Sequence, residues 1–201
     1  MSPGQAPLTT LPNLYLFGLP GVGKTFCGEC LERDLGYSFH DGDQWLPEDL
    51  RESLKRGHGF TEEQRDRYVA EIARCIQVAK DMEQQEALRC GRPARPLAVA
   101  QATFKRRHRQ QIGARHPEFT FVWIQANEEA RLQRLAQRGS GVDAQLGRKM
   151  KLDFEAPGFE EKHLVFYNDQ DEIEDLQQKS DAFVQNLHET LSEVTCCTGF
   201  D

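Results

Sequence analysis

Eight consecutive residues near the N-terminus have the types and the spacing needed to hold a chain of phosphates. They run Gly18-Leu19-Pro20-Gly21-Val22-Gly23-Lys24-Thr25 and match the phosphate-binding pattern G-x-x-x-x-G-K-[ST]. Glycines let successive backbone N–H groups turn toward phosphate oxygens, and the end of a following helix adds a positive dipole. We therefore predict that this loop binds a nucleoside triphosphate, with Lys24 on its terminal phosphates and the Thr25 hydroxyl on Mg²⁺.

Two carboxylates, Asp41 and Asp43, follow the predicted strand at residues 37–40. Because the carboxyl ends of parallel strands share one edge of a sheet, both acids should lie beside the phosphates. Residues two apart in an extended segment point the same way, so both side chains should face the same crevice. Asp41, nearer the strand, should support the metal, and Asp43 should meet an acceptor hydroxyl as base or positioner. The alternative is an Asp-Gly turn with solvated acids.

The periodicity of the chain predicts the elements that would position these groups. A capping box at Thr61 and Gln64 should begin the longest helix. The alternation of strands and helices indicates an α/β fold of three layers, with a parallel sheet of about five strands. The expected strands are 13–17, 37–40, 96–100, 119–124 and 163–167. The expected helices are 26–35, 47–55, 61–88, 103–114, 127–137, 143–154 and 173–194.

Length and composition place the chain among ordinary globular domains. It has 201 residues, 38% hydrophobic and 28% charged, with a formal net charge of −7. This acidity argues against a general nucleic-acid surface, and the sequence has no apolar run of membrane-spanning length. Six cysteines lack the density of a disulfide scaffold, so we expect a reducing, cytoplasmic setting. We predict one domain at residues 13–195 between flexible tails, 1–12 and 196–201, and leave a homodimer open.

Several segments resemble gluconate kinases in their order and spacing, and the chain is also similar to the related shikimate kinases. The resemblance covers about residues 13–190 and implies a P-loop kinase fold with a small lid. It also implies an ATP-dependent kinase of a small hydroxylated acid. The segments that carry the resemblance are 18–25, 39–43, 47–49, 57, 60–65, 100–105, 134–138 and 154–157.

On the nucleotide side, the resemblance implies that ATP and Mg²⁺ are the cofactors. ATP would contact residues 18–25 together with Arg134. Arg134 and Arg138 would come over the triphosphate when a lid at about residues 138–150 closes. Lys24 and Arg138 are then the expected catalytic cations, because phosphoryl transfer needs positive charge around the γ-phosphate.

On the acceptor side, the resemblance implies a small anionic molecule such as the sugar acid gluconate. Asp43 would be the catalytic carboxylate and a substrate contact, and Arg65, Gln101 and Lys105 would bind the substrate. This half of the site departs from the family pattern. Gluconate kinases have a histidine at the position of Leu46, and shikimate kinases have a glycine triplet after the third strand that is absent here. Two alternatives therefore stay open: a nucleoside or nucleoside-monophosphate kinase, and a nucleotide-binding protein without kinase turnover.

Overall fold

A computed structural model describes residues 11–137 and 142–168, with residues 178, 181, 182, 184–187 and 189 of the C-terminal segment. Its centre is a five-stranded sheet in the order β2-β3-β1-β4-β5, and every neighbouring pair of strands is parallel. The strands are β1 (Asn13–Phe17), β2 (Ser38–Asp41), β3 (Leu97–Ala100), β4 (Phe119–Gln125) and β5 (Leu164–Tyr167). The predicted α/β class and strand number are confirmed.

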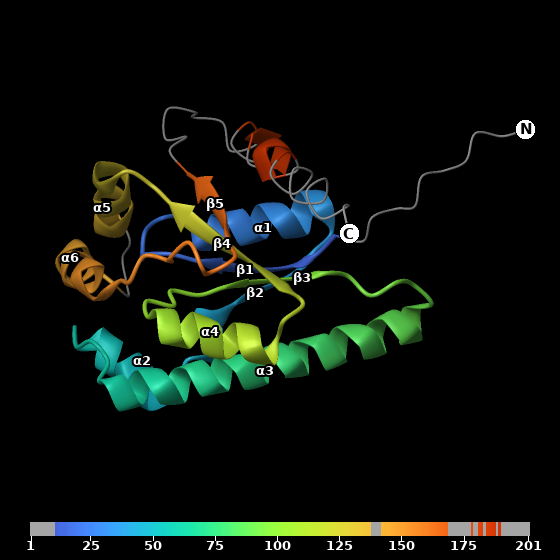
Figure 1. Ribbon diagram of the computed structural model, residues 1–201, viewed down its shortest axis with the longest axis horizontal. Coiled ribbons are helices and arrows are strands. Elements are labelled where there is room, and N and C mark those ends of the chain that lie inside the picture. Colours follow the sequence, from blue (N-terminus) through green and yellow to red (C-terminus); the bar gives the residue numbers. More distant parts are fainter. Residues whose placement is uncertain are drawn as a thin grey trace, which may run out of the picture.

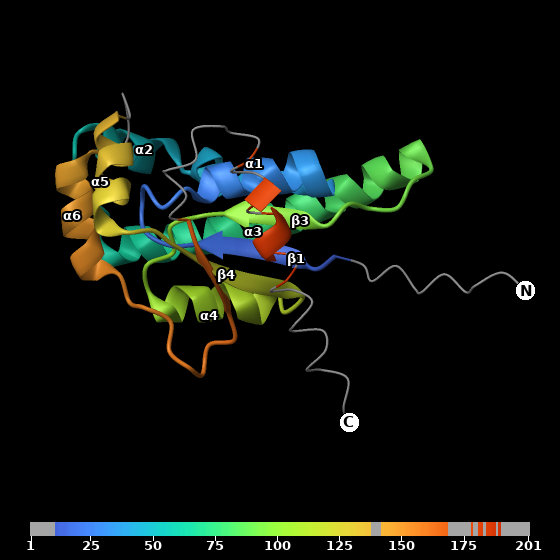
Figure 2. The same cartoon turned by 90° about the horizontal axis from the view of Figure 1, so that it is seen from above.

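Helices cover both faces of this sheet and give the fold its three layers (Figure 1). α1 lies on one face and α3 and α4 on the other, while α5 and α6 stand at one end of the molecule, as a second view also shows (Figure 2). The helices are α1 (Lys24–Leu35), α2 (Glu48–Lys55), α3 (Glu62–Cys90), α4 (Arg106–Arg115), α5 (Glu128–Gln137) and α6 (Ala144–Asp153), with a 3₁₀ turn η1 (Gly42–Trp45). Among the described residues, no helix is both long and apolar enough to span a membrane.

The central strand β1 supplies side chains to the core on both faces of the sheet. Leu14 and Leu16 pack in the cluster on the α1 side, whereas Tyr15 and Phe17 pack with Ile72 of α3. Successive side chains of a strand point to opposite faces, so a strand covered on both sides must be apolar throughout. This burial holds fixed the carboxyl end of β1, from which the glycine-rich loop leaves.

The predicted start of α3 is confirmed in atomic detail. The Thr61 hydroxyl accepts from the Gln64 backbone N–H at 3.3 Å, and the Gln64 side chain accepts from the Thr61 backbone N–H at 2.9 Å. Each side chain satisfies a backbone donor that has no partner within the helix. The helix therefore begins at one defined residue and presents a constant face to the sheet.

The predicted start of α4 at residue 103 is wrong, because the helix begins at Arg106. The Thr103 hydroxyl is instead hydrogen-bonded to the Tyr15 hydroxyl at 2.7 Å, and the Phe104 side chain is buried. These tertiary contacts keep the backbone after β3 out of the helix and beside the strand ends.

The predictions for the termini concern residues that lie largely outside the described part of the chain. Residues 1–10 of the predicted N-terminal tail and residues 196–201 of the C-terminal tail are outside it. Most of the predicted helix at 173–194 is outside it too, and residues 181, 182 and 184–187, which are described, are helical.

We predict that Gly28→Val destabilises the fold. A Cβ atom at Gly28 would lie 2.0 Å from the Phe39 ring, so α1 would have to move away from β2. Overpacking of this kind costs about 1–3 kcal/mol. Urea unfolding measures the loss, and Glu29→Val at the exposed neighbouring position is the control for helix propensity. Equal losses in both variants would contradict the close packing of α1 on β2.

Candidate active site

The glycine-rich loop connects β1 to α1 and curves around the side chain of Lys24. The Lys24 ammonium donates to the carbonyl oxygens of Gly18 at 3.1 Å and Leu19 at 3.0 Å. α1 begins at Lys24 itself, so its first backbone N–H groups, which lack helical acceptors, open onto the loop. The arrangement offers an ammonium group and a helix N-terminus to one anion.

Asn168, which follows β5, supports the loop from the neighbouring strand ends. Its side-chain amide donates to the Val22 carbonyl at 2.8 Å, and its backbone N–H donates to the Gln125 carbonyl at 2.7 Å. A Cβ atom at Gly23 would lie 2.1 Å from this amide, and Gly23 has a φ of +92°. Only glycine suits that position. Sequence reasoning missed Asn168, although a polar residue directly after a predicted apolar strand was a usable signal.

Two arginines of α5 contact the back of the loop. Arg131, whose side chain is 1% exposed, donates to the Pro20 carbonyl at 3.2 Å and pairs with Glu128 at 2.9 Å. Arg134 donates to the Gly21 carbonyl at 3.4 Å and to the Asn168 carbonyl at 2.9 Å. The sequence-based prediction placed Arg134 on the triphosphate and overlooked Arg131. Arg138 and the glycines at 139 and 141 lie outside the described residues.

Thr25 and Asp41 meet beside the loop. The Thr25 hydroxyl donates to Asp41 Oδ2 at 3.0 Å, which joins the first turn of α1 to the end of β2. A hydroxyl and a carboxylate are hard oxygen ligands of the kind that Mg²⁺ takes, usually together with phosphate oxygens and water. The described residues contain no group of three or more His, Cys, Asp or Glu that could hold a metal by itself. The donor set therefore fits a nucleotide-bound Mg²⁺.

Asp43 does not lie in an extended segment, and the expected geometry is wrong on this point. The Asp41 carboxylate accepts from the Asp43 backbone N–H at 3.0 Å and caps the 3₁₀ turn that begins at Gly42. A short acidic side chain that captures the N–H group two residues on turns the chain. Even so, Asp41 and Asp43 line the same cavity.

That cavity, of about 270 Å³, extends from the loop to the space between α3 and the end of β3. Nine of the predicted site residues line it: Pro20, Gly21, Gly23, Lys24, Thr25, Asp41, Asp43, Arg65 and Gln101. Away from the loop, most of its wall is apolar. The apolar lining residues are Leu46, Leu54, Phe60, Val69, Ile72, Ala100, Ala102, Phe104, Val142 and Met150.

Lys105 lies outside this lining. Its ammonium is paired with Glu155 at 3.3 Å, on the segment that follows α6. The resemblance had placed Lys105 on the substrate, whereas the structure places its charge against a carboxylate of the chain.

A chain of side-chain hydrogen bonds orients Gln101 toward Asp43. The Tyr15 hydroxyl is 2.7 Å from that of Thr103, which donates to Gln101 Oε1 at 3.2 Å. The opposite end of the amide, Gln101 Nε2, is 3.4 Å from both Asp43 Oδ1 and the Tyr68 hydroxyl. Because Thr103 donates to the amide oxygen, the amide nitrogen must face the carboxylate. Sequence reasoning included Gln101 and Asp43 but missed Tyr15, Tyr68 and Thr103.

Tyr68 of α3 also holds the turn that carries Asp43. Its hydroxyl donates to the Gly42 carbonyl at 2.7 Å. Burial raises the pKa of Tyr68, so the hydroxyl keeps its proton and remains a donor at neutral pH. The long helix therefore positions the backbone between the two carboxylates.

The fold and the loop define a nucleotide-binding α/β domain of the P-loop class. The sequence profile of the AAA_33 family, an AAA domain, matches residues 14–157, so the chain belongs to that family. The proteins that the chain is similar to include a gluconokinase and a shikimate kinase, the two kinds of kinase that the sequence resembles.

Two curated relatives match over short stretches. A probable gluconokinase of Xenopus tropicalis is 27% identical over 77 residues, which is 38% of this chain and 40% of the relative. A shikimate kinase of Nostoc sp. is 43% identical over 42 residues, 21% of this chain and 23% of the relative. The matched stretches thus span less than half of either relative.

A solved structure matches over nearly the whole chain. The gluconokinase from Sinorhizobium meliloti 1021 superposes with a TM-score of 0.66 at 20% identity, covering 91% of this chain and 97% of that one. At this identity the likeness establishes the fold.

We predict that Asn168→Ala weakens nucleotide binding about five- to tenfold, because the Val22 carbonyl loses its donor and the loop loosens. Titration with a fluorescent ATP analogue measures the affinity. Asn13→Ala is the matched control, since Asn13 Oδ1 accepts from the Leu97 N–H at 2.8 Å and β1 begins at Asn13, far from the loop. An equal loss in both variants would mean that Asn168 acts only through general stability.

Proposed function

We propose that this protein transfers the γ-phosphoryl group of ATP to a hydroxyl of a small sugar acid such as gluconate. The observation that carries the proposal is the shared cavity, which joins Lys24 and Thr25 of the loop to Asp43 and to a largely apolar end between α3 and β3, where the acceptor would bind. Phosphoryl transfer requires a positioned donor, positive charge and a positioned hydroxyl in one space from which water is largely excluded.

On the nucleotide side, the loop N–H groups and Lys24 would bind the phosphates. Thr25 and Asp41 would hold Mg²⁺, which when bound offsets negative charge on the phosphates. Arg131, Arg134 and Asn168 would keep the loop in shape, and the roles predicted for Arg134 and Arg138 on the triphosphate stay predictions. Binding energy at this end serves to place the γ-phosphoryl group toward the acceptor.

On the acceptor side, Asp43 would accept the hydroxyl proton, and Gln101 would orient the carboxylate. Arg65 lines the cavity and offers a cation to the acid group. The names of the similar proteins, a gluconokinase and a shikimate kinase, support a hydroxylated acid as acceptor. A role for Lys105 would require that it leave Glu155.

A nucleoside or nucleoside monophosphate is the second candidate acceptor. The apolar walls at Leu46, Phe60, Val69 and Ile72 suit the flat face of a base better than a polyhydroxylated chain. Incubation with labelled ATP and a panel of gluconate, shikimate and nucleosides separates the candidates. Transfer to nucleosides alone would overturn the sugar-acid proposal. ATP binding without transfer to any of them would favour a binding protein.

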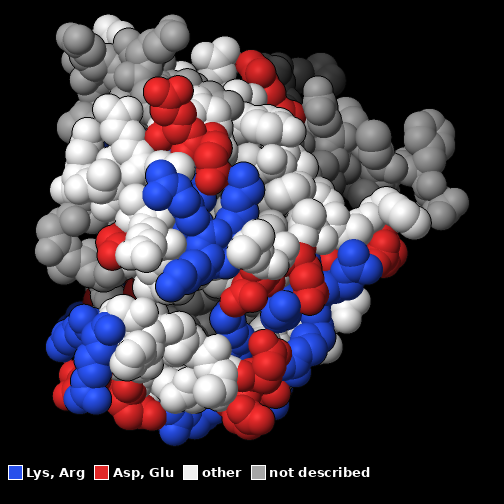
Figure 3. Space-filling view, turned by 90° about the vertical axis from the view of Figure 1, so that its left-hand side faces the viewer, with Lys and Arg blue, Asp and Glu red and all other residues white. Residues whose placement is uncertain are grey.

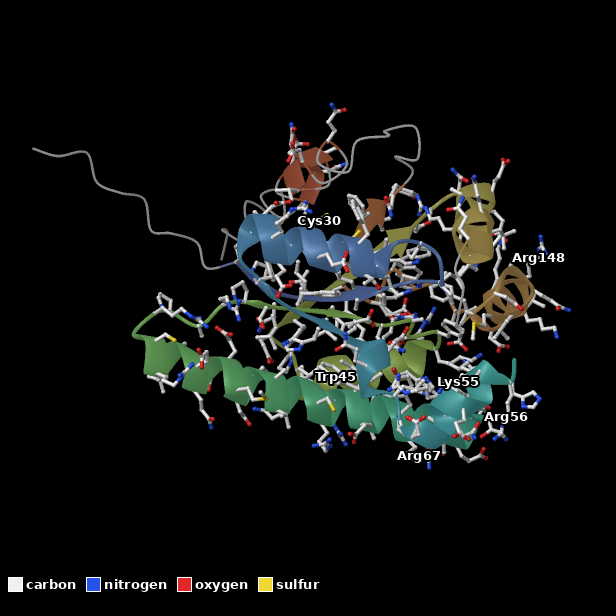
Figure 4. The ribbon with its side chains drawn as sticks, turned by 180° about the vertical axis from the view of Figure 1, so that it is seen from behind. Cys30, Trp45, Lys55, Arg56, Arg67 and Arg148 are labelled. Carbon is white, nitrogen blue, oxygen red and sulfur yellow. The ribbon has the colours of Figure 1, made fainter. Side chains whose placement is uncertain are left out.

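Lys24→Ala should weaken ATP binding about 10- to 100-fold, because a charged hydrogen-bond donor to the phosphates is removed. Equilibrium titration with ATP and Mg²⁺ measures the change. Lys55→Ala, at the exposed end of α2 (Figure 4), removes the same charge away from the loop and should leave the affinity unaltered. An unchanged ATP affinity in Lys24→Ala would contradict the assignment of this loop as the nucleotide site.

The two carboxylates should respond differently to neutralisation. Asp43→Asn should lower kcat on the true acceptor by about 10²–10⁴ with near-normal ATP affinity, as loss of a general base does. Asp41→Asn should instead raise the Mg²⁺ concentration required for half-maximal rate. Steady-state kinetics at varied Mg²⁺ test both. The assignment fails if Asp43→Asn keeps its kcat or if the two variants show the reverse pattern.

A further inference from the structure

The last residue of α6, Asp153, and the segment that follows it place carboxylates against basic residues near the acceptor end of the cavity. We call residues 153–161 the acidic strap. Seen from the end at which α5 and α6 lie, blue basic and red acidic side chains are interspersed over the surface (Figure 3). The ion pairs of the strap are Arg65–Asp153, Lys105–Glu155, Arg106–Glu160, Arg106–Glu161 and Arg109–Glu161.

Beyond Asp153, the strap is attached by contacts that do not depend on Arg65. The Glu155 backbone N–H donates to the Phe104 carbonyl at 2.9 Å, and its carboxylate accepts from the Arg106 N–H at 2.9 Å. Phe154 stacks on Trp123 with ring centroids 6.0 Å apart. The Asp153 side chain is 51% exposed, and its ion pair with Arg65 is 2.9 Å long. Asp153 can therefore release its partner while the strap stays in place.

Arg65 is held at the cavity wall by more than its ion pair with Asp153. Its side chain is 14% exposed, and Nε donates to the Phe60 carbonyl at 3.3 Å. The guanidinium lies over the Phe104 ring, 5.4 Å from the centroid. The Phe60 carbonyl and the Phe104 ring hold the Arg65 guanidinium in place, so the side chain is preorganised for a carboxylate. Little side-chain entropy is then lost when the carboxylate binds.

We propose that Asp153 competes with the anionic group of the acceptor for Arg65 and so sets the affinity of the site for anions. The inference rests on the proposed function, in which Arg65 binds the acid group of the acceptor. Asp153 accepts a hydrogen bond from Arg65 Nη2 at 2.9 Å, and Glu62 lies 3.8 Å from Arg65 Nε. An incoming carboxylate therefore meets a cation whose charge is already partly offset, and it gains less than it would from an arginine without Asp153. Asp153 is in this sense a positioning residue that acts through Arg65.

Asp153→Asn should bind gluconate about three- to fivefold more tightly than the unaltered chain, the effect expected for a partly exposed ion pair. Calorimetric titration with gluconate gives Kd without the need for turnover. The control is Glu160→Gln, which removes the same charge from the strap but pairs with Arg106. It should leave the gluconate affinity near that of the unaltered chain.

Kinetics give a second measurement that a purely structural role of Asp153 would not reproduce. In Asp153→Asn, KM for gluconate should fall while kcat and KM for ATP stay constant, and Asp153→Glu should restore the higher KM. In an Arg65→Ala background, Asp153→Asn should have no effect, as expected for residues that act through one interaction.

Failure of this inference can be told apart from failure of the proposed function. If no variant transfers phosphate to gluconate, the sugar-acid proposal fails, whereas the calorimetric comparison still tests the competition. The competition between Asp153 and the acceptor is overturned if Asp153→Asn binds gluconate with the same affinity as the unaltered chain, or more weakly. It is also overturned if neither protein binds gluconate. An equal gain in Glu160→Gln would mean that charge alone, and not Arg65, is responsible.

Discussion

The active-site end of this molecule depends on finding donors for the backbone carbonyl groups of one loop. When the N–H groups of a loop point toward a phosphate site, its carbonyl oxygens point away from that site. Carbonyl oxygens that are shielded from water then need hydrogen-bond donors from the protein. Five consecutive carbonyls have side-chain donors, and three of these donors come from elements that are distant in sequence. The donors are Lys24 for Gly18 and Leu19, Arg131 for Pro20, Arg134 for Gly21 and Asn168 for Val22. Helix α5 and the end of β5 are thus tied to the loop, which explains how residues 110 to 150 positions away belong to the site.

The opposite side of the cavity is organised by a second set of tertiary contacts. Tyr68 holds the Gly42 carbonyl, and the Thr103 hydroxyl orients Gln101 toward Asp43. Long helix α3 therefore sets both the apolar wall and the placement of the carboxylate. The cation at this end, Arg65, is offset by Asp153, so its ion pair with the strap influences how strongly an anion is held. Under the proposed function, the nucleotide and the acceptor would share this one cavity.

Local patterns predicted those features that local physics governs. Residues within a few positions of one another determine the cap of α3 and the strand before the loop. The same holds for each element in the alternation of strands and helices that indicates a parallel sheet. Predictions that needed the path of the chain through space did less well. Asp43 was expected in an extended segment, yet the Asp41 side chain turns the chain there. Lys105 was expected in the acceptor site, yet Glu155, fifty residues later, takes its charge. α4 was expected to begin at residue 103, but Thr103 is held by Tyr15 instead.

By itself, the sequence determined that this chain is an α/β P-loop domain with its glycine-rich loop at residues 18–25, between the first strand and the first helix. It could do so because the loop, its strand and its helix are contiguous and their signals are strong. Only the tertiary structure decided which side chains pair with the loop carbonyls, how Gln101 faces Asp43 and which cation reaches the cavity. Arginines and carboxylates are numerous in this chain, and no periodicity distinguishes one pairing from another. Their partners are chosen by the packing of whole elements, which places Arg131 beside Pro20 and Arg65 beside Asp153.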